Sequence, residues 1–567
     1  MVVLRKPPSV LRCAPGDFGG TKLSLLLEKQ HNRGQDGAGA AILASDPEPG
    51  VAPYWIAKSA SATPLVDVLG AIAKRPNSSS HKERIFLGHL RYATFGKNEV
   101  AFCHPFVHEA SELEHTLLLA GNFNLTNAHE LFDDYSRHGS FPTSKADGYL
   151  ICELIAHELG KDFSRVERVE PAPKKLHVST CSTRFKNISR ALTTALANAD
   201  GAWTLCGMTG DGWAFATRDP HGIRPGFYYI DDEVAVVASE RPAIQAAFDV
   251  PPSAVKELPP GEILVVSPEG EVRFESLQGK DGDAQPAYRP CSFERIYFSR
   301  ANDADIHRER KALGAALLPQ ILKSAEADLS DIFFSYIPNS ARIAFHGLLE
   351  ELFSGVCNYK NIPRFGEIAV KDAKFRTFIA DAAARREFYK HVYDVTYGLV
   401  RPGKDTLVVL DDSIVRGNTM KNAILPMLDR LEPRRIVIAS SAPPIRYPDC
   451  YGIDMSTLGE LVAFRALVNL LGGRAGLLSL LGDSEIWRIG KYSKESPKFL
   501  ASETLSSESH RPSNPLAALY DRFTDEQHCA EIARLLTPPG MKAEVKVVYQ
   551  TAEDLRRCLQ PPNYQTT

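Results

Sequence analysis

Two adjacent carboxylates, Asp411 and Asp412, are the residues of this sequence that most clearly suggest chemistry. Neighbouring carboxylates suit the hydroxyls of a sugar, or a hard cation such as Mg²⁺. In the polar turn after them, Gly417 lets the backbone approach an anion closely, and the hydroxyls of Ser413 and Thr419 can donate hydrogen bonds to it. A site for hydroxyls beside a site for phosphate describes a sugar phosphate. The same pattern also fits an ordinary strand-to-helix turn whose acids cap the helix.

The neighbouring elements must position this turn. Residues 406–410 are nearly all apolar, which is typical of a parallel strand covered on both faces. After the turn, apolar residues recur at the spacing of a helix, in which Pro426 is expected to cause a kink: Met420, Ile424, Met427, Leu428 and Leu431. Because the first N–H groups of a helix have no partner inside it, they stabilise an anion at that end. The stretch therefore predicts a strand, an acidic pair, an anion-binding turn and a helix.

The full string VVLDDSIVRGNT, residues 408–419, resembles the phosphoribosyl-pyrophosphate (PRPP) signature of type I phosphoribosyltransferases, in the form found in amidophosphoribosyltransferases. The resemblance implies that Asp411 and Asp412 bind the ribose hydroxyls and Mg²⁺. It implies that the 5′-phosphate is held by the turn that follows, where Asn418 replaces the usual Thr: Ser413, Arg416, Gly417, Asn418 and Thr419.

Two further stretches match the same family. Ser340 follows the apolar run 332–337, and the carboxyl end of such a strand is where ligands of an open α/β sheet collect. The resemblance implies that this turn faces the pyrophosphate and the metal. Lys371, Lys374 and Arg376 lie within six positions and resemble the basic segment that closes over PRPP. We predict that Lys374 and Arg376 bind PRPP and that Arg376 is catalytic. An exposed basic surface is the alternative interpretation of this segment.

Five Gly- and Asn-rich stretches occupy the N-terminal half, and each alone is typical of a turn between strands. Together and in this order they resemble the class II glutamine amidotransferase domain, which has an N-terminal-nucleophile (Ntn) hydrolase fold. The stretches are QHNRGQDGAG (30–39), GHLRYATFG (88–96), AGNFNLTN (120–127), RDPHGIRP (218–225) and ASER (238–241). The resemblance to amidophosphoribosyltransferases then continues through CSFERIYFSRANDAD (291–305), SYIPNS (335–340) and RYPDCYGIDM (446–455), so that in all it covers roughly residues 20–470.

This second resemblance implies a glutamine site. Arg91 would bind the substrate's α-carboxylate, Asp147 its α-amino group, and Asn122 the oxyanion, which makes Asn122 catalytic. The family's nucleophile is an N-terminal cysteine, whereas this sequence begins Met1-Val2-Val3-Leu4. The nearby Cys13 lacks the expected strand context and is not expected to be catalytic. A truncated start is the preferred explanation, and an inert glutaminase half is the alternative.

The predicted fold is α/β and α+β multidomain, with an Ntn-hydrolase αββα sandwich followed by a type I phosphoribosyltransferase α/β domain with a parallel sheet. The expected domains are residues 1–280, 291–480 and, after a Ser/Lys/Glu/Pro-rich linker at 491–515, a small C-terminal lobe at 516–567. A net charge of −3 and the lack of an apolar run near ~20 residues argue against nucleic-acid and membrane partners. Ten scattered cysteines without a C-x-x-C pair fit a reduced, cytoplasmic protein.

The two resemblances together imply an enzyme that forms 5-phosphoribosylamine from PRPP and glutamine-derived ammonia, the first step of purine synthesis. They also imply that the enzyme uses Mg²⁺ as a cofactor, that purine nucleotides inhibit it and that it forms a homo-oligomer. Some relatives hold a [4Fe–4S] cluster, which is not expected here because Cys291 and Cys450 match two positions but only Cys529 and Cys558 follow them. The alternatives are an ammonia-dependent phosphoribosyltransferase with an inert glutaminase domain and a non-catalytic PRPP-binding regulator.

Overall fold

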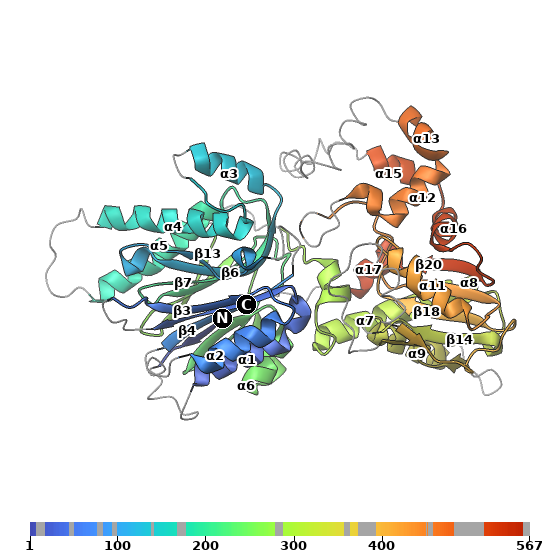
Figure 1. Cartoon of the computed structure of the whole chain (residues 1–567), viewed down its shortest axis with the longest axis horizontal. Helices are drawn as coiled ribbons and strands as arrows, with labels where there is room; N and C mark the ends of the chain where they lie inside the picture. Colours follow the sequence, from blue (N-terminus) through green and yellow to red (C-terminus); the bar gives the residue numbers. More distant parts are fainter. Residues whose placement is uncertain are drawn as a thin grey trace. The chain divides into compact units, whose positions relative to one another are not determined.

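The computed structural model divides into two compact units. The first comprises Met1–Glu294 together with Tyr451, and the second begins at Arg295 and contains the remaining residues (Figure 1). The structure describes residues 1–6, 17–44, 50–75, 83–92, 99–137, 141–166, 177–277, 287–338, 340–355, 363–371, 393–449, 451, 457–480 and 515–559.

Two antiparallel sheets lie face to face in the first unit. One has seven strands in the order β11-β9-β10-β1-β4-β2-β3, and the other has six in the order β13-β12-β8-β7-β6-β5. The seven are β1 (Val2–Leu4), β2 (Gly37–Ala44), β3 (Tyr54–Ser59), β4 (Glu83–Arg91), β9 (Phe227–Ile230), β10 (Val234–Ala238) and β11 (Lys256–Glu257). The six are β5 (Phe106–His108), β6 (Leu117–Leu125), β7 (Gly201–Thr209), β8 (Ala214–Arg218), β12 (Glu262–Val266) and β13 (Val272–Ser276).

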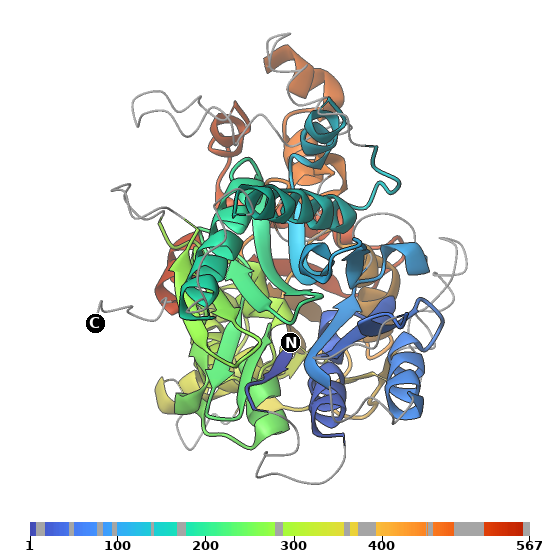
Figure 2. The ribbon, with the colours of Figure 1, turned by 90° about the vertical axis from the view of Figure 1, so that its left-hand side faces the viewer.

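Strand alternation explains why this unit has three buried layers. In β4, Ile85 and Leu87 face the other sheet, whereas Phe86 and Leu90 face outward against helices. The outer face of the seven-stranded sheet is covered by α1 (Phe18–Lys29), α2 (Pro64–Lys74) and α6 (Arg241–Phe248). The outer face of the six-stranded sheet is covered by α3 (Ala128–Arg137), α4 (Asp147–Val166) and α5 (His177–Leu196). Figures 1 and 2 show these helices on opposite sides of the paired sheets, which confirms the predicted αββα sandwich.

The second unit is built on a five-stranded parallel sheet with the order β15-β14-β18-β19-β20, which confirms the predicted α/β domain. The strands are β14 (Ile332–Tyr336), β15 (Arg364–Phe365), β18 (Thr406–Asp411), β19 (Arg435–Ser440) and β20 (Glu544–Tyr549); β16 (Ala369–Lys371) and β17 (Tyr393–Val395) form a separate antiparallel pair.

Helices cover both faces of this sheet. One face packs against α8 (Leu318–Ala325) and α9 (Arg342–Gly355), with α7 (Ala304–Ala316) against α9. The other face packs against α11 (Leu425–Asp429), α12 (Val462–Leu470) and α16 (Asp525–Leu536). The other α-helices in the described part of this unit are α13 (Gly473–Leu480), α15 (Pro515–Tyr520) and α17 (Ala552–Cys558).

The helix predicted after the acidic pair is divided at its proline. A π-turn, η9 (Met420–Ile424), comes first, and α11 follows with Pro426 in its first turn. A proline at that position removes no hydrogen bond from α11 itself. Pro426 therefore marks a change in helical winding between the two pieces.

The C-terminal segment differs from the prediction. Instead of a lobe at residues 516–567, β20 pairs in parallel with β19 along its whole length, from Arg435↔Glu544 to Ser440↔Tyr549, and α16 packs on the same sheet. The linker composition indicated a break in regular structure, but it carries no information about which sheet edge the chain rejoins. The first unit also extends to Glu294 rather than to residue 280.

Candidate functional site

The acidic pair stands at the carboxyl end of β18, the central strand of the parallel sheet. Asp411 is the last residue of β18, on the face of Leu407 and Val409, which pack against α11, α12 and α16. Asp412 follows on the opposite face, and its residue is 6% exposed. Both acids therefore stand at the edge where ligands of such sheets bind.

Asp412 is held by hydroxyl groups. The hydroxyl of Ser340 donates to its Oδ2, and the hydroxyl of Ser413 donates to its Oδ1 at 2.9 Å. The Asp412 amide donates to Oδ1 of Asp411 at 2.9 Å. Burial raises the pKa of Asp411, and the neighbouring charge of Asp412 raises it further. Burial also raises the pKa of Asp412, against the lowering effect of the two hydroxyls. A bound cation, or hydrogen bonds donated by hydroxyl groups, would therefore stabilise the ionised form of these two carboxyl groups.

The donor set fits Mg²⁺. In the described part of the chain, no group of three or more His, Cys, Asp or Glu side chains is arranged to hold a metal ion. Mg²⁺ commonly takes only one or two carboxylates from a protein and completes its shell with water and substrate phosphate oxygens. Asp411 and Asp412 are suited to that role.

The turn after the acids has a conformation that requires glycine. Gly417 has φ +76°, and a Cβ there would lie 2.3 Å from Cδ2 of Leu536 in α16. The helix begins immediately afterwards, with the amide of Lys421 donating to Gly417 O at 2.9 Å. Lys421 Nζ also donates to Leu535 O at 2.8 Å. The turn is thus packed tightly onto α16, with helix N–H groups directed toward it.

In the first unit, Arg91 and Asp147 form a pair of opposite charges. Arg91 ends β4, is 5% exposed and lies over the Phe102 ring, with its guanidinium carbon 5.6 Å from the ring centroid. Asp147 begins α4, and burial raises its pKa to about 6, against the lowering effect of the Arg91 charge. A buried cation near a half-buried carboxylate can bind both charged ends of an α-amino acid.

Asn122 continues the inward-facing row of β6. Leu118 and Ala120 face the other sheet, so Asn122 has the same orientation, while Phe123 packs outward. His104 connects this strand to β4, because its Nδ1 accepts from the amide of Gly121 at 3.4 Å and its ring stacks on His89 at 4.0 Å between centroids. Burial lowers the pKa of His104 well below its ordinary value, with smaller lowering effects from His89, Lys58 and Arg91.

The antiparallel pairing of β1 with β4 points the N-terminal end of β1 toward the part of β4 that contains His89. Val3 pairs with Ile85 and Val2 with Phe86, and the Met1 ammonium donates to Val237 O at 2.7 Å. Met1 and Val3 face the other sheet. If the strand were continued, a residue two positions before Met1 would face the same way and lie opposite His89.

Comparisons with known proteins give a consistent result. No protein-family model matches the chain. Among curated proteins, it is 28% identical over 410 residues to an amidophosphoribosyltransferase of Methanocaldococcus jannaschii, covering 70% of this chain and 77% of that one. It is 29% identical over 445 residues to the Bacillus subtilis amidophosphoribosyltransferase, covering 77% and 79%.

Solved structures extend the similarity to nearly the whole chain. One, described as the allosteric regulatory enzyme of purine biosynthesis, has a TM-score of 0.63 at 23% identity and covers 97% of this chain and 91% of its own. Another, the glutamine PRPP amidotransferase from B. subtilis complexed with ADP and GMP, has a TM-score of 0.58 at 25% identity, covering 81% and 90%. The chain is therefore similar to amidophosphoribosyltransferases over most of its length, and these enzymes are glycosyltransferases that transfer pentosyl groups.

Most of the residues predicted from the amidophosphoribosyltransferase resemblance lie in two places. Ser340 and the sequence from Asp411 to Thr419 gather at the carboxyl end of β18. Within that turn, the Arg416 guanidinium pairs with Glu460 at 2.7 Å, and Asn418 and Thr419 are exposed. Lys374, Arg376 and Cys13 lie outside the described residues.

Sequence reasoning missed several residues around the transferase site. The Ser441 hydroxyl donates to Asp412 O at 3.2 Å, and the buried Arg310 interacts electrostatically with the Asp412 carboxylate. Ser441 could have been found by the rule that strand ends collect ligands, since it follows the apolar run of β19. Tyr549 of β20 interacts electrostatically with Asp411, and no local signal marked it.

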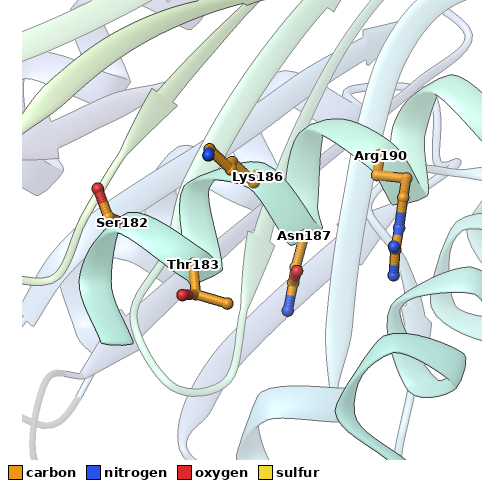
Figure 3. Close-up of a pocket in the computed structure, with 5 residues that line it drawn as sticks. All are labelled: Ser182, Thr183, Lys186, Asn187 and Arg190. Atoms are coloured by element: carbon orange, nitrogen blue, oxygen red, sulfur yellow. The ribbon is translucent and has the colours of Figure 1, made fainter. Parts of the chain in front are cut away.

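A separate hollow lies along α5, lined by Ser182, Thr183, Lys186, Asn187 and Arg190 (Figure 3). It contains none of the predicted site residues, and Ser182 Oγ already accepts a hydrogen bond from Arg273 at 3.0 Å. We therefore assign it no part in the family's chemistry. Among the described residues, no helix is both long and apolar enough to cross a membrane.

Proposed function

We propose that this chain catalyses the amidophosphoribosyltransferase reaction, in which ammonia displaces pyrophosphate from PRPP to give 5-phosphoribosylamine, the first step of purine synthesis. The observation that carries the proposal is the pair of half-buried Asp411 and buried Asp412 at the carboxyl end of β18, directly before the glycine turn. The similarity to amidophosphoribosyltransferases supports the same reaction.

The chain's own residues would bind and orient the sugar phosphate. Asp411 and Asp412 would accept hydrogen bonds from the ribose hydroxyls, and the backbone around Gly417 with the following helix N–H groups would hold the 5′-phosphate. The ammonia lone pair forms the C1–N bond as the C1–O bond to pyrophosphate breaks, and the new ammonium group then releases a proton. Mg²⁺ held by the two aspartates would neutralise charge on the departing pyrophosphate. We assign Lys374 and Arg376 to the same leaving group.

Glutamine is the proposed source of ammonia. Arg91 would bind its α-carboxylate, Asp147 its α-ammonium group, and Asn122 would donate to the oxyanion. The chemistry also needs a nucleophile. Cys103 is unsuited to that role, because it is fully buried, its thiol donates to Ser59 O at 3.5 Å, and burial raises its pKa.

The second candidate is the same transfer using free ammonia. In that case the first unit would be inert and the transferase unit would act alone. The assay below distinguishes the two candidates.

Several further properties are proposed from the family. A related structure is described as complexed with ADP and GMP, so we propose purine nucleotides as inhibitors. We also propose a cytoplasmic homo-oligomer without nucleic-acid or membrane partners, in keeping with a net charge of −3.

The test is PRPP-dependent release of pyrophosphate, measured with Mg²⁺ and either glutamine or ammonium. Turnover with both supports the full reaction, turnover with ammonium alone selects the second candidate, and turnover with neither selects a PRPP-binding regulator. The double replacement Asp411→Asn and Asp412→Asn should abolish turnover, and unchanged turnover would contradict the proposal. Asp331→Asn makes the same chemical change at the opposite, amino end of the sheet and should leave turnover intact.

A further inference from the structure

Three residues form a row across the carboxyl end of the parallel sheet. Asp411 of β18 pairs with Ser440 of β19, and Ser440 pairs with Tyr549 of β20. All three lie on one face, since the residues two and four positions before each pack in the same cluster beneath α11, α12 and α16. Two strand spacings place the backbones of Asp411 and Tyr549 about 10 Å apart. A tyrosine side chain can span much of that distance.

The Tyr549 hydroxyl is buried and has no hydrogen-bond partner among the described residues. Tyr549 is 6% exposed, and its oxygen is inaccessible to solvent. Ser440 stands between it and Asp411, but the Ser440 hydroxyl donates away from the row, to Ala442 O at 2.8 Å. A buried hydroxyl without a partner is unfavourable, so its retention in a protein calls for an explanation.

The electrostatic surroundings keep this hydroxyl protonated. Burial raises the pKa of Tyr549 well above its ordinary value, and the nearby groups of Cys529 and Asp411 raise it further. The phenol is therefore a hydrogen-bond donor in the neighbourhood of a carboxylate. The Asp411 carboxylate accepts from the Asp412 amide and has further acceptor positions on its two oxygens.

We propose that Tyr549 is a positioning residue for Asp411, and that its hydroxyl donates to the Asp411 carboxylate when PRPP is bound. This role rests on the proposed function of the site. The bond would fix the carboxylate in the orientation that accepts hydrogen bonds from the ribose hydroxyls. The free chain would keep the hydroxyl unpaired, and the bound chain would satisfy it.

The same C-terminal segment also supports the phosphate side of the site. The Leu536 side chain of α16 fills the space beside Gly417, and Leu535 O accepts from Lys421 Nζ. Cys529, about two turns earlier on the same helix, packs in the cluster that contains Tyr549. Strand β20 thus lies near the acidic part of the proposed sugar-phosphate site, and helix α16 lies beside its glycine turn. Within this segment, Tyr549 interacts electrostatically with Asp411.

A matched control stands at the other end of the same sheet. Thr406, the first residue of β18, is fully buried, and its hydroxyl also has no partner among the described residues. Thr406→Val and Tyr549→Phe each remove one buried, unpaired hydroxyl while keeping the shape of the side chain. Only Tyr549 lies at the ligand end. If the Tyr549 hydroxyl had a purely structural role, the two variants would show the same changes in Tm and in PRPP affinity.

The experiment measures thermal unfolding of the full chain and of both variants, titrated with PRPP in the presence of Mg²⁺. Without ligand, both variants should have a Tm equal to or above that of the parent chain, because neither loses a hydrogen bond. Tyr549→Phe should weaken PRPP binding about tenfold, the loss expected for one hydrogen bond to a charged group. Thr406→Val should leave it unchanged. In the ammonium assay, Tyr549→Phe should raise the KM for PRPP by a similar factor.

The outcomes separate this role from the proposed function. If the parent chain binds PRPP and Tyr549→Phe binds it equally well, the positioning role is wrong and the proposed function stands. If both variants lose PRPP affinity equally, the effect is one of general stability and the role is again wrong. If the parent chain itself shows no PRPP-dependent shift, the proposed function fails and the role fails with it.

Discussion

The replacement Gly417→Ala tests how the glycine turn after Asp412 is built. At φ +76° a residue with a Cβ sits in the left-handed region, which costs about 1–2 kcal/mol. The new Cβ would also lie 2.3 Å from Cδ2 of the buried Leu536, although 3.7 Å from Cγ of Leu536 and from Cγ2 of Val462. Only the end of a flexible side chain must move, which costs about 1 kcal/mol as an unfavourable rotamer. We expect a total loss of about 2–3 kcal/mol in the free energy of unfolding.

The assay is denaturant unfolding of the free chain, followed by titration with PRPP and Mg²⁺. Because the backbone at this position is expected to approach the phosphate, Gly417→Ala should also weaken PRPP binding by at least about tenfold. Gly403→Ala is the matched control, since Gly403 has φ +66° and an added Cβ would meet nothing within 4 Å. It should lose only the backbone cost of about 1–2 kcal/mol and keep its PRPP affinity. Equal losses of stability and affinity in the two variants would refute the reasoning.

Two further predictions concern the first unit. Because burial raises the pKa of Asp147 from 3.8 to about 6, the folded chain without ligand should lose stability as the pH rises from about 4 to about 6. Glutamine binding, measured by calorimetry on both sides of pH 6, should weaken as Asp147 gains a proton, and Asp147→Asn should remove this dependence. Placing Cys-Gly directly before Met1, with the cysteine as the first residue, should put a thiol opposite His89 and permit glutamine hydrolysis, measured as glutamate release. An Ala-Gly extension should not, and an inactive Cys-Gly chain would contradict the assigned position of the glutamine site.

The local features of the transferase site could be predicted from the sequence because they depend on neighbouring residues. The apolar run 406–410 defines a strand, and the strand determines where Asp411 and Asp412 must stand. Gly417 was expected at a position of close backbone approach, and the structure gives it a positive φ. Arg91 and Asp147 were assigned from motifs, and their shared electrostatic environment agrees with one site, although their contacts with glutamine stay a prediction.

The role of the C-terminal segment could not be predicted in the same way. Glu544–Tyr549 was expected to be a strand, but a parallel strand pairs with a partner far away in the sequence, here β19. Composition cannot identify that partner, so the segment was assigned to a separate lobe. The proximity of Tyr549 to Asp411 depends on this pairing and on its register. A shift by one residue would turn Tyr549 to the other face of the sheet.

The two adjacent acids have different surroundings because strand alternation directs them to opposite faces of the sheet. Asp412 accepts hydrogen bonds from Ser340 and Ser413 and interacts with the charge of Arg310, so its orientation is set before any ligand arrives. Asp411 accepts from the Asp412 amide and lies on the face of Tyr549. Asp412 is therefore suited to hold the turn in shape. Asp411, with acceptor positions remaining, is suited to take the larger share of the contacts with a sugar or a metal ion.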